Sequence, residues 1–206
     1  MRIKKRHKQP RGSTPGVPPR EGYTWFSLQG CVADTQLSRL GMSAACMKDI
    51  FRWVEQSLQG QPVPETGGFL TGKFLHDKQA DSFVSWVEHF VPAEGVDYQD
   101  PVLLAFGTGP LLEVDRYLQA QPGQCLIGWF HTHPGHSPYL SATDLHTHEG
   151  FFREAYQVAI VLDPLTPAFD TGIFSRKTDG SMNNQIDYSH WFQWKHTDIY
   201  RQMEAN

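Results

Sequence analysis

Three residues near the middle of the chain have the types and spacing of a metal site. His131 and His133 stand two residues apart, and Asp144 follows eleven residues after His133. Alternate residues of a strand point to the same side, so both imidazoles can reach one ion. The glycine and prolines in the loop before Asp144 allow that loop to fold back and bring a carboxylate to the same point. Two imidazoles and one carboxylate leave the fourth position of tetrahedral zinc open for water, as in catalytic sites.

Two further side chains fit the chemistry that such a site needs. Zinc lowers the pKa of its bound water to about 7, but amide hydrolysis also needs a group that accepts a proton and delivers it to the leaving amine. We predict Glu65 for this role, because the glycines after it allow a neighbouring strand to approach closely and bring its carboxylate beside the metal. We predict that the Ser141 hydroxyl donates a hydrogen bond to the oxyanion.

Each of these features also has an ordinary structural explanation. Ser141 and Asp144 have the spacing of a helix capping pair, which is common at helix starts. Glu65 alone would be a surface carboxylate at a turn, and a lone H-x-H is a weak signal. The combination, together with the strand that precedes it, favours the metal-site interpretation.

The surrounding sequence predicts elements that can position these residues. Helical spacing of apolar residues runs from Ser43 to Gly60 and from Pro110 to Ala120, and a third helix is expected to begin at Ser141. Strand-like runs are Gly68 to Phe74, Ser82 to Val91, Cys125 to Phe130, Gln157 to Leu162, and Thr171 to Arg176. The first two are expected to pair as neighbours, and the third leads directly into His131. This order predicts a layered α/β domain.

Charge is distributed unevenly along the 206 residues. Seven of the eighteen Lys and Arg residues fall within positions 1–20, where there is no acidic residue, leaving 11 basic against 22 acidic residues elsewhere. The first segment is also rich in proline, so we predict a flexible basic arm over residues 1–22 and one domain over residues 23–206. The acidic body argues against nucleic acid as the main partner.

The composition also indicates where the protein works. The sequence contains no long apolar run and no signal-peptide core in its first twenty residues. Cys31, Cys46 and Cys125 are odd in number and lack C-x-x-C spacing. We therefore expect a cytoplasmic protein that does not associate with membranes.

The candidate site resembles the JAMM (MPN-plus) metalloprotease family, whose pattern is a distant Glu followed by H-x-H-P, six residues and S-x-x-D. Glu65, His131, His133, Ser141 and Asp144 meet every position. The segment Gly-Trp-Phe-His-Thr-His-Pro over 128–134 is similar to the deubiquitinases of this family, whereas the RadC branch usually carries Asn between the two His. The segments 65–73, 144–148 and 171–180 are most similar to the AMSH group.

The resemblance implies an α/β fold, a JAMM/MPN domain related to cytidine deaminases, with a central mixed β-sheet flanked by helices. It also implies zinc-dependent cleavage, as a peptidase or isopeptidase, after the C-terminal glycine of ubiquitin or a ubiquitin-like protein. Similar bacterial enzymes belong to ubiquitin-like conjugation systems, some linked to antiviral defence. E1- and E2-like proteins of such a pathway are then further expected partners.

The resemblance points to a second metal site as well. AMSH enzymes hold a structural zinc, and the matching positions here are His146, His190, His196 and Asp198, with His replacing Cys and Asp replacing the last His. All four are residue types that bind zinc. In the alternative interpretation, His190 and His196 belong to an aromatic C-terminal segment, over about 185–206, that forms a lid or partner surface. His136 and His148 are interpreted as a loop residue and a solvated helix residue.

Two other functions compete with the protease. One is a non-catalytic MPN scaffold without metal, against which the full ligand set argues. The other is a RadC-like protein or another zinc hydrolase such as a nucleobase deaminase, although the deaminase pattern of H-x-E with P-C-x-x-C is absent.

Overall fold

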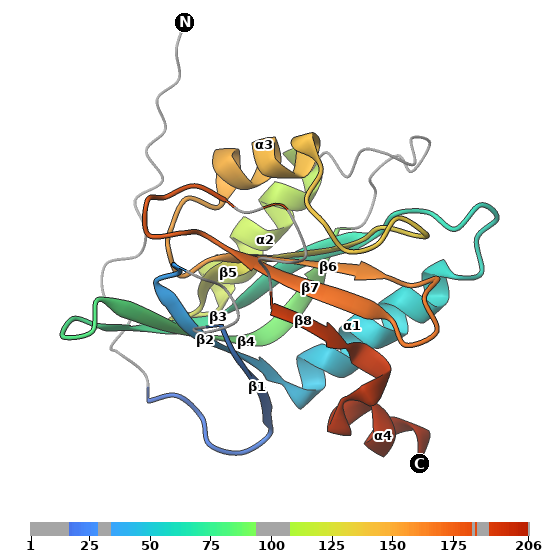
Figure 1. Cartoon of the computed structure of the whole chain (residues 1–206), viewed down its shortest axis with the longest axis horizontal. Helices are drawn as coiled ribbons and strands as arrows, with labels where there is room; N and C mark the ends of the chain where they lie inside the picture. Colours follow the sequence, from blue (N-terminus) through green and yellow to red (C-terminus); the bar gives the residue numbers. More distant parts are fainter. Residues whose placement is uncertain (1–16, 29–33, 94–107, 183, 185–189, 206) are drawn as a thin grey trace, which may run out of the picture.

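A mixed β-sheet forms the centre of the computed structural model, which describes residues 17–28, 34–93, 108–182, 184 and 190–205 (Figure 1). The strands are β1 (Tyr23–Ser27), β2 (Leu37–Ser43), β3 (Gly67–Asp77), β4 (Ser82–Pro92), β5 (Cys125–Thr132), β6 (Val158–Asp163), β7 (Asp170–Ser175) and β8 (His190–Gln193). Their order across the sheet is β1-β2-β4-β3-β5-β6-β7-β8. The pairs β2–β4 and β5–β6 are parallel, and the other neighbours are antiparallel.

Helices cover both faces of this sheet. They are α1 (Ala44–Ser57), α2 (Thr108–Ala120), α3 (Ala142–Phe151) and α4 (Asp198–Glu204). One core packs α1 and α4 against the sheet, with Ile50 of α1 and Ile199 of α4 among its buried residues. The other core packs α2 and α3 on the opposite face, around Phe69 and Trp129 (Figure 1). The predicted α/β architecture, with a mixed sheet between helices, is therefore confirmed.

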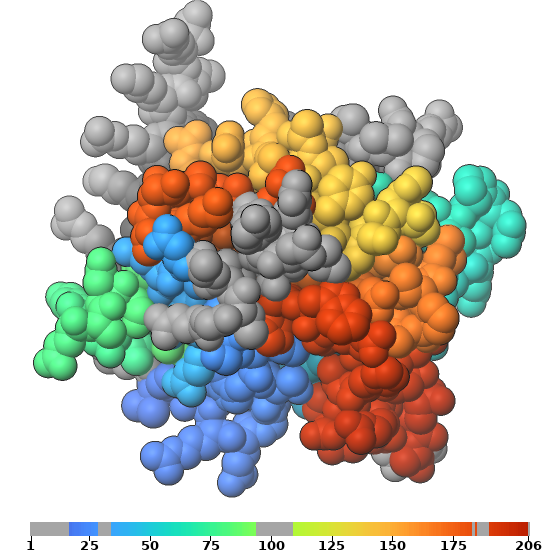
Figure 2. All heavy atoms as spheres, viewed as in Figure 1, coloured from blue at the N-terminus to red at the C-terminus, as the bar shows by residue number. Residues whose placement is uncertain are grey.

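The sheet curls enough for its two outermost strands to touch. The ring of Phe26 in β1 lies 4.5 Å from the ring of Phe192 and 5.5 Å from the ring of His190, both in β8. Figure 2 shows β1, in blue, and the C-terminal segment with α4, in red, covering adjacent parts of the surface. These aromatic contacts cover the apolar sides of two edge strands that would otherwise be exposed.

Most predicted elements are present with small shifts of their ends. β3 and β4 pair as expected, from Gly68 with Pro92 to Asp77 with Ser82. Ser43 caps α1 by accepting a hydrogen bond from the backbone nitrogen of Cys46 (3.1 Å). Residues 1–16 of the predicted basic arm lie outside the described residues, and so does Cys31. None of the described helices is long and apolar enough to cross a membrane.

Candidate metal centre

The side chains of His131, His133 and Asp144 meet at one point. The Nε2 atoms of the two histidines lie 3.1 Å apart. Each also lies 3.4 Å from a carboxylate oxygen of Asp144, Oδ1 for His131 and Oδ2 for His133. All three residues are buried. Within the described residues, this is the one group of three His, Cys, Asp or Glu residues close enough to hold a metal ion.

Two neighbouring elements bring the three side chains together. His131 lies in β5 and His133 directly follows that strand, held by a hydrogen bond from its backbone nitrogen to the carbonyl of Leu162 in β6 (2.9 Å). Asp144 lies in the first turn of α3. A carboxylate is favoured there by the positive end of the helix dipole. The strand end and the helix start therefore converge on one site.

Ser141 is the N-cap of α3. Its Oγ accepts a hydrogen bond from the backbone nitrogen of Asp144 (3.2 Å), and its own backbone nitrogen donates to Oδ2 of Asp144 (2.7 Å). The capping pair weighed above is thus present in the structure. In that contact the hydroxyl oxygen is an acceptor, so its hydrogen can be donated elsewhere. The cap orients the Asp144 carboxylate, and the oxyanion role of Ser141 stays a prediction.

Glu65 lies beside the cluster without belonging to it. Its Oε1 atom is 3.9 Å from Nε2 of His133, and its side chain is 15% exposed. Three hydrogen bonds fix the next residue, Thr66. Its backbone nitrogen donates to Oγ1 of Thr132 (2.9 Å), and its carbonyl oxygen accepts from the backbone nitrogen of Thr132 (2.8 Å). The Oγ1 atom of Thr66 accepts from Nε1 of Trp53 (2.6 Å). Glu65 is therefore held next to the end of β5.

Gly67 makes this approach possible. It pairs with His131 across the β3–β5 ladder, and a Cβ atom at this position would lie 2.2 Å from the carbonyl oxygen of Phe130. No side chain fits in that space, so only glycine allows the strands to meet there. The prediction that the glycines after Glu65 permit close strand approach is confirmed at this position.

Asp163 organises the loop after His133, and the sequence interpretation did not single it out. This carboxylate is buried at the end of β6 and accepts from the backbone nitrogens of Gly135 (2.8 Å), Ser137 (3.0 Å) and Leu165 (2.9 Å). Gly135 and Ser137 have positive φ angles of 78° and 63°, which a serine rarely adopts without such support. Because β5 and β6 are parallel, a carboxylate ending β6 lies beside the loop that leaves β5.

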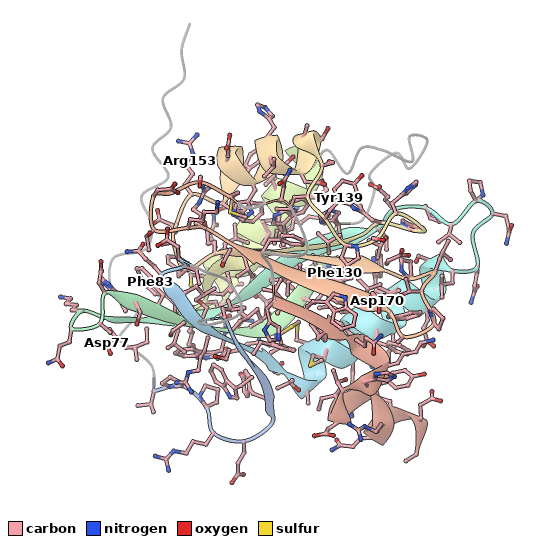
Figure 3. All side chains as sticks on the ribbon, viewed as in Figure 1. Asp77, Phe83, Phe130, Tyr139, Arg153 and Asp170 are labelled. Carbon is pink, nitrogen blue, oxygen red and sulfur yellow. The ribbon has the colours of Figure 1, made fainter. Side chains whose placement is uncertain are left out.

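Aromatic rings flank both histidines of the cluster. The Trp129 ring stacks on the His131 ring with centroids 4.2 Å apart and an 8° angle between the planes. The Tyr139 ring, which Figure 3 labels at the end of the loop before α3, lies 4.9 Å from the His133 ring at 54°. Tyr139 is one of the exposed large apolar side chains, so the His133 side of the site faces the surface.

The interpretation of His148 as a solvated residue is wrong. Its side chain is fully buried, and its Nδ1 accepts a hydrogen bond from Trp129 Nε1 (3.1 Å). His148 stands four residues after Asp144 on α3, so it faces the same side of the helix. His146, two residues earlier, points to solvent. His136 lies exposed in the loop, as predicted.

The protonation of the cluster suits a cation. Burial lowers the pKa of His131, so its imidazole is neutral near pH 7. Burial alone would raise the pKa of Asp144, but His131 and the hydrogen bonds around the carboxyl hold it well below its usual range. Neutral imidazole and ionised carboxylate are the forms that bind zinc.

The spacing of the ligand atoms also fits zinc. Zinc–nitrogen bonds of about 2.0–2.1 Å in a tetrahedron put neighbouring ligand atoms roughly 3.3 Å apart. The three separations here are 3.1, 3.4 and 3.4 Å. When both Nε2 atoms are unprotonated, two nitrogen lone pairs and a carboxylate face one another in a buried place, and a cation would satisfy all three. The residues present therefore fit a zinc ion.

The structure does not assemble the second metal site expected from His146, His190, His196 and Asp198. His146 is exposed on α3, and His190 in β8 packs against the Phe26 ring. Asp198 instead pairs with Arg201 in the first turn of α4 (3.2 Å). Among the described residues these four side chains form no metal-binding group. The alternative, in which His190 belongs to an aromatic segment, agrees with its ring contact to Phe26.

Comparison with known proteins gives a family match and several relatives. A family model for prokaryotic homologs of the JAB domain matches residues 48–168, which include every residue of the cluster and Glu65. AMSH-like protease of Mus musculus is 37% identical over 123 residues, which are 57% of this chain and 24% of that protein. Ubiquitin carboxyl-terminal hydrolase RPN11 of Saccharomyces cerevisiae is 29% identical over 122 residues, 56% of this chain and 36% of that protein.

This chain thus spans about a quarter of the mouse protease and about a third of the yeast hydrolase. A solution structure of a Desulfitobacterium hafniense protein matches with a TM-score of 0.49 and 22% identity. The match covers 70% of this chain and 88% of that protein's chain. At that distance the likeness says nothing about function.

Proposed function

This chain belongs to the family of prokaryotic homologs of the JAB domain, and on that premise we propose that it is a zinc-dependent peptidase or isopeptidase. Its substrate would be ubiquitin or a ubiquitin-like protein, cut after the C-terminal glycine. The observation that carries the proposal is the buried cluster of His131, His133 and Asp144 with the Glu65 carboxylate 3.9 Å from His133. The mouse and yeast relatives, an AMSH-like protease and a ubiquitin carboxyl-terminal hydrolase, support the substrate class.

The three buried side chains would hold the ion, and Glu65 would handle protons. A zinc ion bound there would act as a Lewis acid toward the scissile carbonyl and lower the pKa of a water molecule to about 7. Glu65 accepts a proton from the attacking water and transfers it to the amine that leaves, so one water is added across the amide bond. The partial burial of Glu65 keeps this carboxylate close to the site while leaving it in reach of water.

Ser141 would stabilise the negative charge that develops on the carbonyl oxygen. Its oxygen already accepts from the Asp144 nitrogen, which fixes the hydroxyl beside the site and leaves its hydrogen to donate. Loss of one such donor typically costs about 10² to 10³ in rate. Ser141 would then have two roles, one in the helix cap and one in the reaction.

The setting that we propose is a cytoplasmic ubiquitin-like conjugation pathway. The substrate would be a precursor of the modifier or its conjugates, and E1- and E2-like proteins would act in the same pathway. Antiviral defence is the biological role that we propose for such a pathway.

Cleavage of defined substrates tests the proposal. The purified chain is incubated with ubiquitin carrying a C-terminal peptide, with lysine-linked diubiquitin and, as alternatives, with nucleosides, and the products are identified by mass spectrometry. We expect cleavage after the terminal glycine of a ubiquitin-like substrate, loss of activity with a zinc chelator, and about one zinc per chain. A protein purified from zinc-containing medium with far less metal would favour the scaffold, and action on nucleosides alone would favour another zinc hydrolase.

A further inference from the structure

His131 lacks the contact that usually orients a metal-binding histidine. Such residues almost always donate their second ring nitrogen to a carboxylate, carbonyl or water, which fixes the tautomer and the plane of the ring. The Nδ1 atom of His131 is buried and has no hydrogen-bond partner among the described residues, and the same holds for Nδ1 of His133. Among the described residues, the plane that directs Nε2 toward His133 and Asp144 is therefore set by side chains that pack against the ring and not by an acceptor at Nδ1.

The Trp129 indole is in the position to do so. It lies two residues before His131 on the same side of β5, and the two rings are nearly parallel, 4.2 Å apart at 8°. Both side chains are completely buried. A ring stacked face to face on a fixed plane cannot tilt without losing that contact or clashing with it, so the indole plane determines the imidazole plane.

The indole is itself fixed on two sides. Its Nε1 donates to Nδ1 of His148 (3.1 Å), and the Phe152 ring lies parallel to it, 5.9 Å away at 12°. The Phe152 ring also stacks on the His148 ring (5.4 Å, 26°). His148 lies in the last turn of α3 and Phe152 is its C-cap, so the helix that carries Asp144 also anchors the indole behind His131.

The position of α3 is fixed at this end by Arg176, whose guanidinium donates to the carbonyl oxygens of Phe152 (2.8 Å) and His148 (3.5 Å). Indole nitrogen can only donate, so His148 must present an unprotonated Nδ1 to it. Burial, followed by the charge of Arg176, lowers the pKa of His148 to about 3, so His148 stays neutral and keeps this acceptor.

We propose that Trp129, anchored by His148, is a positioning residue that sets the ring plane of His131 for metal binding. The contact to His133 is different, because Tyr139 meets that ring at 54° and is exposed. The parallel, completely buried stack on Trp129 is therefore specific to His131. This inference rests on the proposed metal function.

Cobalt and zinc binding by variants of the full chain test the proposal. Trp129→Leu removes the stacked ring, and His148→Leu removes only its anchor. His148→Asn keeps an acceptor close to the position of Nδ1 and should restore binding. Trp194→Leu is the matched control, because Trp194 is also completely buried, lies in the other core, and has an Nε1 without a partner among the described residues.

Zinc affinity is measured by competition with a chelator, and the geometry of the site is read from the visible absorption spectrum of the Co²⁺ form. We expect Trp129→Leu to weaken zinc binding by about 10- to 100-fold, the range typical of lost outer contacts. We expect a loss of roughly 10-fold for His148→Leu, with a changed Co²⁺ spectrum in both. His148→Asn and Trp194→Leu should keep the wild-type spectrum and affinity, although Trp194→Leu lowers the unfolding temperature.

Folded variants at Trp129 and His148 that bind zinc like the wild type, with an unchanged Co²⁺ spectrum, would overturn the inference. Equal loss of affinity in Trp194→Leu would also overturn it, since the effect would then reflect general destabilisation. If Trp129→Leu does not fold, the comparison of His148→Leu with His148→Asn decides. Wild-type protein that binds no zinc would instead contradict the proposed function, so the two failures are distinguishable.

Discussion

The Oε1 atom of Glu65 lies 3.9 Å from Nε2 of His133, although the two residues come from different parts of the chain. Glu65 precedes β3, and His133 follows β5. The pairing of Gly67 with His131 brings these strand ends together. The carboxylate lies beside the three converging side chains without being one of them.

Glu65→Gln should keep zinc and lose turnover. The amide has nearly the same size as the carboxylate but cannot accept the proton, so kcat should fall by about 10² to 10⁴. Zinc content, measured by mass spectrometry, should remain about one per chain. Glu55→Gln, at an exposed position of α1, is the matched control and should retain full activity. Near-normal cleavage by Glu65→Gln would show that another group carries the proton.

His131→Ala should lose both metal and activity, because it removes one of three ligands from a buried site. His196→Ala provides the comparison, since His196 is exposed in the segment where the second metal was expected. We expect zinc content to fall far below one per chain in His131→Ala and to stay unchanged in His196→Ala. Two zinc ions per wild-type chain, with one of them lost in His196→Ala, would show that the second metal site exists after all.

The convergence of His131, His133 and Asp144 could be predicted from sequence because their spacing directly encodes their geometry. Histidines two apart at a strand end share a side, and Ser141 and Asp144 have the spacing of a helix start. His148 was misjudged because its burial depends on Trp129, a residue of another element. The i to i+4 relationship of Asp144 and His148 was the available signal.

The second metal site failed for a related reason. The spacing of His190, His196 and Asp198 is compatible with shared ligation, but spacing cannot tell where a C-terminal segment docks on the sheet. In the structure, β8 pairs with β7 and turns His190 toward Phe26. The strands β1, β2 and β8 were likewise not predicted, and β2 pairs with β4, a partner distant in the chain.

Ser141→Ala and Ser141→Gly together separate the two roles of this hydroxyl. Alanine at an N-cap typically costs about 1 kcal/mol of stability, whereas glycine costs only a few tenths. Both variants lack the hydroxyl, so both should lower kcat by about 10² to 10³ with little change in KM. Steady-state kinetics and urea unfolding measure the two effects. If Ser141→Gly were nearly fully active and only Ser141→Ala lost both kcat and free energy of unfolding, Ser141 would act through the helix cap alone.

The stability of the metal-free protein should depend on pH through His148. The pKa of this group is lowered from 6.5 to about 3 by burial and then by Arg176. Because the unfolded chain takes up this proton more readily, the contribution of neutral His148 to stability is complete above about pH 6.5. It is lost progressively as the pH falls toward about 3, by at most about 1.4 kcal/mol per pH unit.

The comparison of wild type with His148→Asn isolates this effect, since asparagine does not titrate. Urea unfolding in the presence of a chelator is measured near pH 7 and near pH 4.5. The wild type should lose more free energy of unfolding on acidification than His148→Asn does. The lowered pKa of His131 contributes equally to both proteins and cancels in the difference. Parallel losses in the two proteins would mean that His148 is not held neutral in the fold, which would remove the acceptor assigned to the Trp129 indole.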